Sequence, residues 1–293
     1  MSRWKQVPPQ PSRTFLVTGA SSGVGLATAD ALAQAGARVI MAVRNRVKGE
    51  EAAATISPAN GGSVEIGVVD LADQTSVRTF AATVGEIDVL INNAGVLGVP
   101  YELTPEGVEM HFATNHLGHY SLTNLLLPRI RERVVVVASA SHKTGDLQLD
   151  DLDWARRGYK AYAAYAASKL ANLQFLTELD RRLREAPSPV RATGAHPGTT
   201  GTNITAHSTS RLRKAVGGWG HQLTGMPPWK GALPSLYAAT EDVPGNSYIG
   251  PTGMFELYGW PGPASRTPAS LDTAASRALW DRSAELTGID FQA

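Results

Sequence analysis

Short runs of apolar, often β-branched residues alternate along the chain with longer alanine- and leucine-rich stretches. The runs are apolar at nearly every position, which is typical of strands covered by helices on both faces. They predict six strands, at Thr14–Thr18, Arg38–Val43, Val64–Val69, Ile87–Ile91, Val134–Ala138 and Val190–Ala195. The longer stretches have helical spacing over residues 24–35, 46–55, 74–84, 105–126 and 160–185.

This alternation predicts an α/β domain with a doubly wound parallel sheet and helices on both of its faces. Residues 1–13 are polar and proline-rich, so we expect an extended N-terminal arm there and a single domain over residues 14–293. Gly, Thr and Pro are frequent in residues 197–230, which predicts a substrate lid at about 199–230, after the sixth strand. A last strand is expected near Met254–Leu257 and a last helix near Leu271–Leu286.

Composition narrows the function classes. Hydrophobic residues make up 43% of the 293, enough for a sizeable core, and the formal charge of +1 gives no reason to expect nucleic acid or a membrane surface as partner. The absence of cysteine excludes disulfides, thiolate catalysis and cysteine-ligated metals. The sequence contains no run of eighteen apolar residues, which a membrane-spanning helix would need. A cytoplasmic protein without stable membrane insertion is therefore expected.

The first predicted strand leads directly into a glycine-rich turn, Thr18-Gly19-Ala20-Ser21-Ser22-Gly23-Val24-Gly25, before a predicted helix. Glycines let the backbone approach a pyrophosphate closely, and the helix start offers unpaired N–H groups to the anion. The spacing Gly-x3-Gly-x-Gly differs from the Gly-x-Gly-x-x-Gly fingerprint, and close strand-to-helix packing is the alternative explanation. We expect a dinucleotide phosphate site at Gly19, Ser21, Ser22, Gly23, Val24 and Gly25.

The end of the second predicted strand distinguishes the two nicotinamide dinucleotides. An NAD site usually has an Asp or Glu there, about 20 residues after the glycines, but this chain reads Val43-Arg44-Asn45-Arg46. Arg44 can pair with a 2′-phosphate through its planar guanidinium. We therefore expect NADP(H) rather than NAD(H), with an exposed helix-start arginine as the alternative.

Tyr165 and Lys169 lie four residues apart in an alanine-rich stretch, where they would share one face of a helix. A lysine cation beside a phenol favours the phenolate and lowers the pKa of the tyrosine, which prepares it for proton transfer near neutral pH. Such pairs are also common on solvated helices. Tyr159 and Tyr162 lack a lysine four residues on and are weaker candidates.

From about Thr14 to the C-terminus, these motifs together resemble the short-chain dehydrogenase/reductase family. Besides the glycine turn, the chain has Asp70-Leu71 after the third strand, Asn92–Gly95 after the fourth, and Pro197-Gly198 followed by Thr202 after the sixth. The resemblance implies a Rossmann-type fold that binds NADP(H). It implies further cofactor contacts from Arg44, Asn45, Asp70, Leu71, Asn93, Ala94, Gly95, Tyr165, Lys169, Pro197, Gly198 and Thr202.

The resemblance also implies an active-site tetrad and a role for each member. Ser139 would polarise the substrate oxygen, Tyr165 would transfer the proton, Lys169 would hold the nicotinamide ribose, and Asn115 would position a water. Ser141 is a nearby alternative to Ser139, because Ala138 replaces the first residue of the family's usual Ser-Ser pair. The implied enzyme interconverts a small-molecule carbonyl and alcohol. Family members are often dimers or tetramers, so a homo-oligomer is one of the states the resemblance leaves open.

Short phrases resemble one branch of the family, the branch that contains retinol dehydrogenases and protochlorophyllide reductases. They are Asn115–His119, Ser168–Asn172 and the long stretch His142–Tyr162, which places Tyr165 26 positions after Ser139. Members of this branch typically prefer NADP(H). The main alternative is a catalytically silent NADP-binding sensor on the same fold, although such sensors often lack the Tyr or Lys. A Rossmann-like methyltransferase would leave Asn92–Gly95 unexplained.

Several other residues have a functional and a structural interpretation. His111, His116 and His119 have the spacing of metal ligands on a helix, but without a convincing third ligand we expect structural or substrate-lining roles and no metal. His196 is expected to pack, and Arg211–Lys214 to form a solvated charged face rather than an anion or membrane site. Trp219, Met226 and Trp229 indicate either an apolar substrate or simple packing of the lid.

Overall fold

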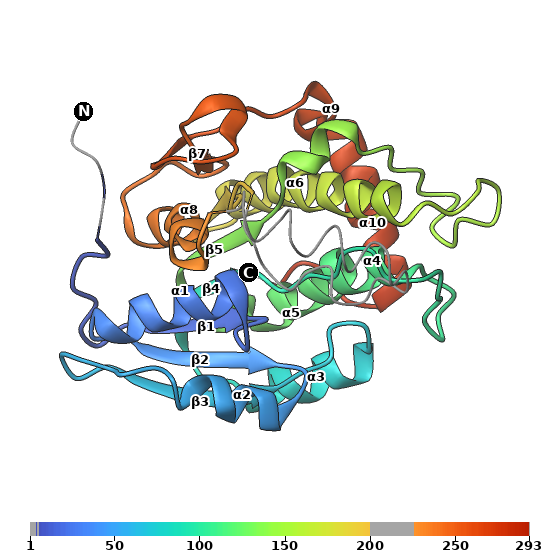
Figure 1. Cartoon of the computed structure of the whole chain (residues 1–293). Coiled ribbons are helices and arrows are strands. Elements are labelled where there is room, and N and C mark those ends of the chain that lie inside the picture. The colour runs from blue at the N-terminus through green and yellow to red at the C-terminus, as the bar shows by residue number, and fades with distance from the viewer. Residues whose placement is uncertain (1–3, 5, 200–225, 293) are drawn as a thin grey trace, which may run out of the picture.

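The computed structural model describes Trp4, residues 6–199 and residues 226–292. These residues form an eight-stranded sheet in the order β3-β2-β1-β4-β5-β6-β7-β8, parallel throughout except between β7 and β8 (Figure 1). The strands are β1 (Thr14–Thr18), β2 (Arg38–Val43), β3 (Ser63–Val68), β4 (Ile87–Asn92), β5 (Ile130–Val137), β6 (Arg191–Ala195), β7 (Tyr248–Pro251) and β8 (Pro261–Pro263). The doubly wound parallel sheet expected from the alternating pattern is confirmed.

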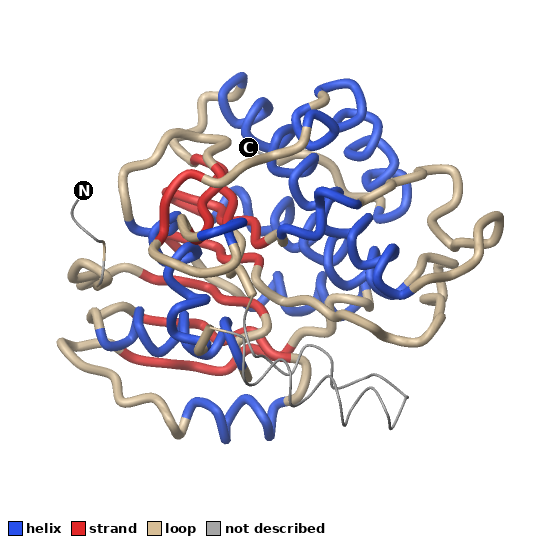
Figure 2. The backbone as a smooth tube through the Cα atoms, turned by 45° about the horizontal axis from the view of Figure 1, so that its top comes forward, coloured by secondary structure: helices blue, strands red, loops and turns tan. Residues whose placement is uncertain are grey.

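Helices connect the strands and cover the sheet (Figure 2). The α-helices are α1 (Gly23–Gln34), α2 (Arg46–Ala53), α3 (Gln74–Thr83), α4 (Met110–Phe112), α5 (Gly118–Leu126), α6 (Ala161–Glu185), α8 (Pro228–Thr240), α9 (Pro268–Leu271) and α10 (Thr273–Thr287). A π-helical turn, η1 (Ala113–Leu117), joins α4 to α5, and short 3₁₀ turns are η2 (Leu127–Arg129), η3 (Ala140–Thr144) and η5 (Met254–Glu256).

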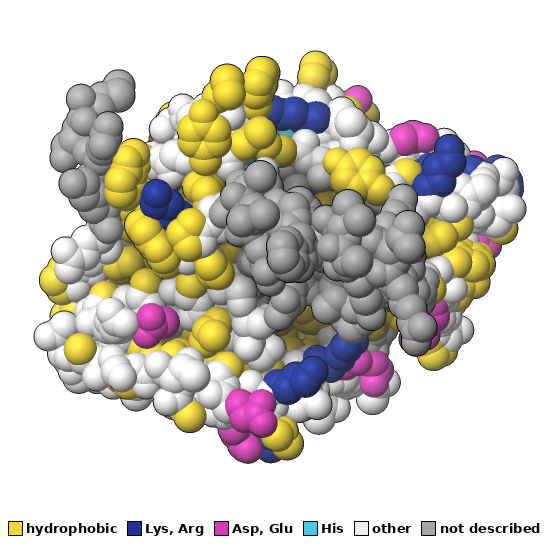
Figure 3. Space-filling view, in the orientation of Figure 1, with side chains coloured by type: hydrophobic (Ala, Val, Ile, Leu, Met, Phe, Trp, Pro, Cys, Tyr) yellow, Lys and Arg dark blue, Asp and Glu magenta, His cyan; other side chains and the backbone are white. Residues whose placement is uncertain are grey.

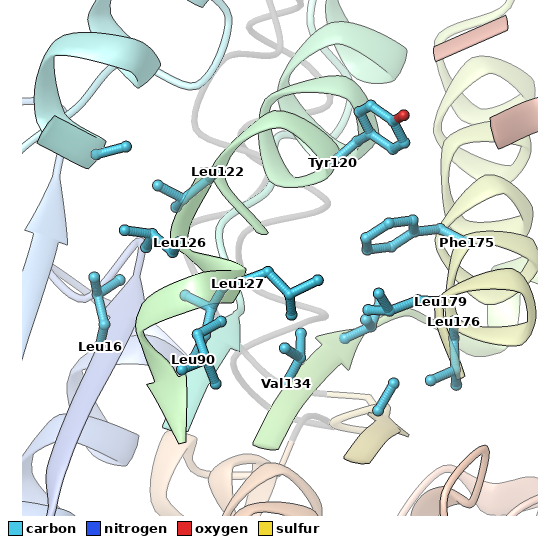
Figure 4. Close-up of a cluster of buried hydrophobic side chains, with 14 of the residues drawn as sticks. Leu16, Leu90, Tyr120, Leu122, Leu126, Leu127, Val134, Phe175, Leu176 and Leu179 are labelled. Carbon is cyan, nitrogen blue, oxygen red and sulfur yellow. The ribbon is translucent and has the colours of Figure 1, made fainter. Parts of the chain in front are cut away.

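Two apolar layers cover the two faces of the sheet, because successive strand residues point to opposite sides. In β1, Leu16 belongs to the layer under α3, α5, α6 and α10, whereas Phe15 and Val17 belong to the layer under α1, α2 and α8. Figure 4 shows the first layer, with Leu90 and Val134 on the strands beneath the leucines of α5 and α6. Burial on both sides explains why these strands read as continuous apolar runs.

Three expectations about secondary structure were wrong. The expected last strand, Met254–Leu257, is not a strand: it lies between β7 and β8, and Phe255 and Glu256 have positive φ angles of 55° and 59° that no strand accommodates. Helix α8 begins at Pro228, inside the expected lid, and was not expected because Pro234 and Gly231 interrupt its pattern. The helix expected over 105–126 begins at Met110 and contains the π-helical turn η1. Residues 200–225 of the expected lid lie outside the described residues.

The described part of the N-terminal arm contacts the C-terminal end of α8. The Trp4 indole N–H donates to the Glu241 carboxylate at 2.7 Å, and the Trp4 ring meets Tyr237 edge-on with centroids 5.5 Å apart. Within the described residues, no helix combines the length and the apolar character that crossing a membrane would require.

Candidate active site

Helix α6 places Tyr165 and Lys169 on one buried face, with 8% and 4% of their surfaces exposed. The Lys169 Nζ lies 5.7 Å from the centre of the Tyr165 ring and donates to the Val137 carbonyl at 3.2 Å. Since Val137 ends β5, this bond ties the pair to the carboxyl edge of the sheet, where ligands bind in open α/β folds.

Burial sets the pKa values of both groups in the protein without ligands. It raises the pKa of Tyr165 to about 12, while hydrogen bonding by Ser139 acts in the opposite direction and lowers it. Burial also lowers the pKa of Lys169 to about 8. The expected lowering of the tyrosine pKa by the lysine cation is therefore wrong for this state, because desolvation of the phenolate dominates. At neutral pH the phenol keeps its proton and is ready to act as a donor.

Ser139 and Ser141 lie together in the turn that follows β5. The Ser139 Oγ accepts from the Ser141 backbone N–H at 3.2 Å and is hydrogen-bonded to the Ser141 Oγ at 3.2 Å. The His142 Nδ1 donates to the Ser139 carbonyl at 2.7 Å and fixes the turn. Of the two serines, Ser139 is the one that lowers the pKa of Tyr165.

Asn115 lies in the π-helical turn η1, a local geometry that is frequent at functional sites. Its side-chain amide accepts from the Val96 N–H at 2.8 Å and donates to the Val96 carbonyl at 3.1 Å and to the Ser168 hydroxyl at 3.0 Å. A Cβ added at Gly95 would lie 3.3 Å from the Asn115 Oδ1 and 3.5 Å from the Lys169 Nζ. The segment after β4 therefore passes directly over the Asn115–Lys169 pair.

The glycine turn after β1 packs so closely that side chains would not fit. A Cβ at Gly19 would lie 2.8 Å from the Ala94 Cα, and one at Gly25 would lie 2.4 Å from the Gly19 carbonyl oxygen and 2.5 Å from the Asn93 Nδ2. Both segments meet at Thr18, whose hydroxyl accepts from the N–H groups of Asn93 and Ala94 at 2.9 Å each. The turn and the segment Asn93–Gly95 thus form one rigid floor.

The start of α1 has the features of an anion site. Ser22 occupies the N-cap position with extended backbone and makes no side-chain capping bond, so its hydroxyl and the first N–H groups of Gly23, Val24 and Gly25 remain available. Ser21 precedes it in the same turn. This arrangement fits the pyrophosphate of a dinucleotide.

The residues after β2 and β3 lie on the other side of that turn. Arg44 is exposed, whereas Asn45 caps α2 by accepting from the Lys48 N–H at 3.0 Å. Asp70 accepts from the Ala72 N–H at 3.0 Å, and Leu71 is buried against Gly118, where an added Cβ would lie 2.1 Å from the Leu71 carbonyl oxygen. Asp70 and Asn45 thus shape the backbone in this structure, and Arg44 is the residue that extends into solvent.

Pro197 and Gly198 follow β6 at the same edge of the sheet. Gly198 has a φ of 68°, and the next residue, Thr199, donates its N–H to the Leu257 carbonyl at 2.9 Å. Thr202 lies outside the described residues, as do Trp219 and Arg211–Lys214.

Two buried polar groups lie beside the tetrad, and they contain His119 and His111, for which the sequence predicted only structural or substrate-lining roles. His119 connects Thr18 to Asn115: its Nε2 lies 2.9 Å from the Thr18 hydroxyl, and its Nδ1 donates to the Asn115 carbonyl at 2.9 Å. Burial lowers the pKa of His119 to about 4, so the ring is neutral at pH 7. In the sequence, His119 stood out only as part of the motif Asn115–His119, which does not indicate what its side chain contacts.

Glu109 and His111 form the second group. The His111 Nδ1 lies 2.6 Å from the fully buried Glu109 carboxylate, and the Gly98 N–H donates to the His111 Nε2 at 3.1 Å. The His111 ring meets Tyr165 edge-on at 6.3 Å. Because His116 instead contacts Ser283, the three histidines have separate partners, and the described part of the chain contains no cluster of three or more His, Cys, Asp or Glu suited to a metal ion.

Comparisons with known proteins agree with this geometry. Residues 13–213 match the family model for short chain dehydrogenases. The chain is 38% identical to mouse retinol dehydrogenase 14, with 94% of this chain and 86% of the relative covered, and 37% identical to human polyprenol dehydrogenase, with 96% and 87% covered. A crystal structure of an uncharacterised protein from Mycobacterium Paratuberculosis superimposes with a TM-score of 0.86 at 44% identity, covering all of both chains.

Proposed function

The chain belongs to the short-chain dehydrogenase/reductase family, in its retinol dehydrogenase-like branch, and from this premise we propose an NADP(H)-dependent reductase with Tyr165 as its acid. The family binds nicotinamide dinucleotides and interconverts carbonyls and alcohols. The observation that carries the proposal is the buried Tyr165–Lys169 pair, which the bond from Lys169 to Val137 ties to the carboxyl edge of the sheet, two residues before Ser139.

The cofactor would lie across the floor formed by the glycine turn and Asn93–Gly95. Backbone N–H groups and the hydroxyls of Ser21 and Ser22 would hold the pyrophosphate, and Pro197-Gly198 would border the nicotinamide. NADP(H) is favoured because Arg44 is exposed and, among the described residues, makes no hydrogen bond or ion pair that would occupy its guanidinium. When bound, the reduced cofactor supplies a hydride.

The chain's own residues then handle the oxygen of the substrate. Ser139 donates a hydrogen bond that polarises the carbonyl, and Tyr165 transfers its phenolic proton to the oxygen as negative charge develops there. The resulting phenolate is stabilised by the nearby Lys169 ammonium, which offsets the cost of burial. Asn115 holds the segment Gly95–Val96 over the lysine through its two bonds to Val96. In the reverse direction Tyr165 accepts the proton from an alcohol.

An apolar substrate is supported by the surface beside Pro197-Gly198. The segment Met254–Tyr258, which Thr199 contacts, exposes Met254 by 61% and Phe255 by 77%, with Leu257 and Tyr258 also exposed. Figure 3 shows hydrophobic side chains gathered over the β7 region of this face. Of the lid residues, Met226 is buried and Trp229 is half-exposed. Two of the relatives are named after retinol and polyprenol. Both compounds are apolar alcohols of the kind that such a surface accommodates.

The experiment follows NADPH consumption against a panel of apolar aldehydes and ketones, with Tyr165→Phe as the matched variant. Turnover should fall by roughly 10²- to 10⁴-fold while NADPH binding, followed by its fluorescence, stays unchanged. Retained turnover in Tyr165→Phe would remove this residue from the mechanism. Turnover with NADH equal to that with NADPH would contradict the cofactor assignment.

A further inference from the structure

Glu109, His111 and Tyr159 form a polar cluster beside Tyr165, and the proposed mechanism gives this cluster no role. The side chains of Glu109 and His111 are fully buried, and the His111 ring meets the Tyr165 ring edge-on with centroids 6.3 Å apart. A carboxylate and an imidazole at such depth need hydrogen-bond partners for their polar atoms. The partners that they have come from separate segments of the chain.

The Glu109 carboxylate holds both the start of α4 and the ring of His111. Its Oε2 accepts from the backbone N–H groups of His111 and Phe112 at 2.9 and 3.1 Å, and its Oε1 lies 2.6 Å from the His111 Nδ1. Because an ionised carboxylate only accepts hydrogen bonds, the Nδ1 carries the ring proton. The Nε2 then has a free lone pair, and the Gly98 N–H donates to it at 3.1 Å. Glu109 thus selects the tautomer that binds Gly98.

Tyr159 adds a connection from this cluster to α6. Its hydroxyl donates to the Val99 carbonyl at 2.8 Å and lies 3.3 Å from the Glu109 Oε1. Tyr159 comes just before the first residue of α6, the helix that carries Tyr165. The cluster therefore fastens the segment Gly98–Val99 to the beginning of the catalytic helix.

The fastened segment continues directly from the floor of the cofactor site. Thr18 holds the backbone of Asn93 and Ala94, and Asn115 holds Val96. Gly98 and Val99 follow as the next positions that side chains fix. Because the same imidazole binds Gly98 and packs on the Tyr165 ring, a shift of this segment would change the surroundings of the proton donor.

We propose that Glu109 and His111 are positioning residues of the reductase, an inference that rests on the proposed function. Glu109 keeps the proton of His111 on Nδ1, and the Nε2 of His111 holds Gly98 in place as one border of the substrate site beside Tyr165. The proton transfer itself stays with Tyr165. Once Gly98 is released, the substrate carbonyl and the Tyr165 hydroxyl meet less often in the geometry that the transfer requires.

Two substitutions of His111 separate its two hydrogen bonds. His111→Gln keeps an acceptor at the reach of Nε2 but loses the donor to Glu109, whereas His111→Asn keeps a donor at the reach of Nδ1 but cannot extend to Gly98. The kcat for carbonyl reduction should fall by roughly 10- to 100-fold in His111→Asn and by no more than roughly 5-fold in His111→Gln. NADPH binding should stay unchanged in both. Equal losses of kcat would overturn the proposal, because filling the space would then explain the histidine.

A second measurement reads the tautomer without turnover. In protein labelled with ¹⁵N at histidine, His111, assigned by its loss in His111→Gln, should show a protonated Nδ1 and an unprotonated Nε2 at pH 7. Glu109→Gln should exchange the two, because a glutamine whose oxygen accepts the backbone N–H groups turns its NH₂ toward Nδ1. Tyr101→Phe is the control and should leave the pattern unchanged, since the Tyr101 hydroxyl donates to the Asp153 carbonyl. A wild-type His111 protonated on Nε2 would contradict the proposal.

The two measurements distinguish failure of this role from failure of the proposed function. If the wild-type protein reduces no carbonyl compound, the proposed function itself fails, whatever the tautomer of His111. If the wild type is active and His111→Asn is as active as His111→Gln, only the positioning role is removed.

Discussion

The candidate site has a cofactor side and a catalytic side, and the two depend on different features of the chain. On the cofactor side, Gly19 and Gly25 lack side chains, and backbone atoms together with the Asn93 and Ala94 side chains lie within about 3 Å of where a Cβ would stand. On the catalytic side, the candidate residues Ser139, Asn115 and Lys169 would act through side chains that come from the N-cap of η3, from η1 and from α6. The first half tolerates no added atoms, whereas the second depends on particular functional groups. Substitutions should therefore separate binding from chemistry.

The largest effect is expected on the catalytic side. Lys169→Met removes the ammonium that stabilises the Tyr165 phenolate, so turnover should fall by roughly 10²-fold or more. Lys160→Met, at the exposed N-cap of α6, is the control and should retain wild-type turnover. Initial rates of NADPH oxidation measure both. Comparable rates in the two variants would show that Lys169 has no catalytic role.

The same Lys169→Met variant should stabilise the protein without ligands. The pKa of Lys169 falls from 10.5 to about 8 on folding, so below about pH 8 the buried charge costs at most about 3 kcal/mol. Between about pH 8 and 10.5 the unfolded chain holds more protons, and wild-type stability gains from rising pH through this group. Urea unfolding at pH 7 and pH 10.5 should therefore show the advantage of the variant shrinking as pH rises; an advantage independent of pH would contradict this.

On the cofactor side, Gly25→Ala should weaken NADPH binding by roughly 10- to 100-fold, because its Cβ would collide with the Gly19 carbonyl and the Asn93 amide. Gly85→Ala is the control, since nothing lies within 4 Å of its added Cβ. Fluorescence titration with NADPH distinguishes the two. Tight binding by Gly25→Ala would mean that the turn serves packing and not the phosphate.

The smallest effect is expected at the rim of the cofactor side. Arg44→Ala should reduce the preference for NADPH over NADH by about 10-fold, because one charge-assisted contact to a 2′-phosphate is lost. Arg46→Ala, which removes the neighbouring arginine paired with Glu50 at 3.6 Å, should leave the preference unchanged. The ratio of the two dissociation constants is the measurement, and an unchanged ratio in Arg44→Ala would contradict the NADP(H) assignment.

The sequence predicted the cofactor half more completely than the catalytic half. The glycine turn lies within eight consecutive residues, and its strand-turn-helix context follows from local hydrophobic periodicity. Tyr165 and Lys169 were also evident from their spacing on a helix. The direction in which the pKa of Tyr165 shifts was not evident from the sequence, because burial of the phenol depends on contacts from distant segments.

Other features depend on packing that no local pattern encodes. His119 contacts Thr18, which lies 101 positions away in the sequence, and Asn115, which lies 4 positions away. The Tyr162 hydroxyl is bonded to Ser141, 21 positions away. The expected strand at Met254–Leu257 has the right composition, but two left-handed residues turn it away from the sheet. Helix α8 begins at Pro228, a favourable first position, but it also contains Pro234, which locally signals an ending and is buried inside the helix.

The π-helical turn η1 makes the active site sensitive to chain length as well as to residue identity. Its wider turn is what sets the register between Asn115, which binds Val96, and the residues just before it. Because a π-helical turn takes roughly one residue more than an α-helical turn, removing a single residue from Ala113–Leu117 would restore ordinary helical winding while the segments on either side keep nearly the same orientation. Glu109 and His111 would then stay beside Tyr159 and Tyr165, whereas Asn115 would lose the position from which it bonds Val96. The extra residue is thus itself part of the site, because it places the Asn115 amide independently of the helices on either side.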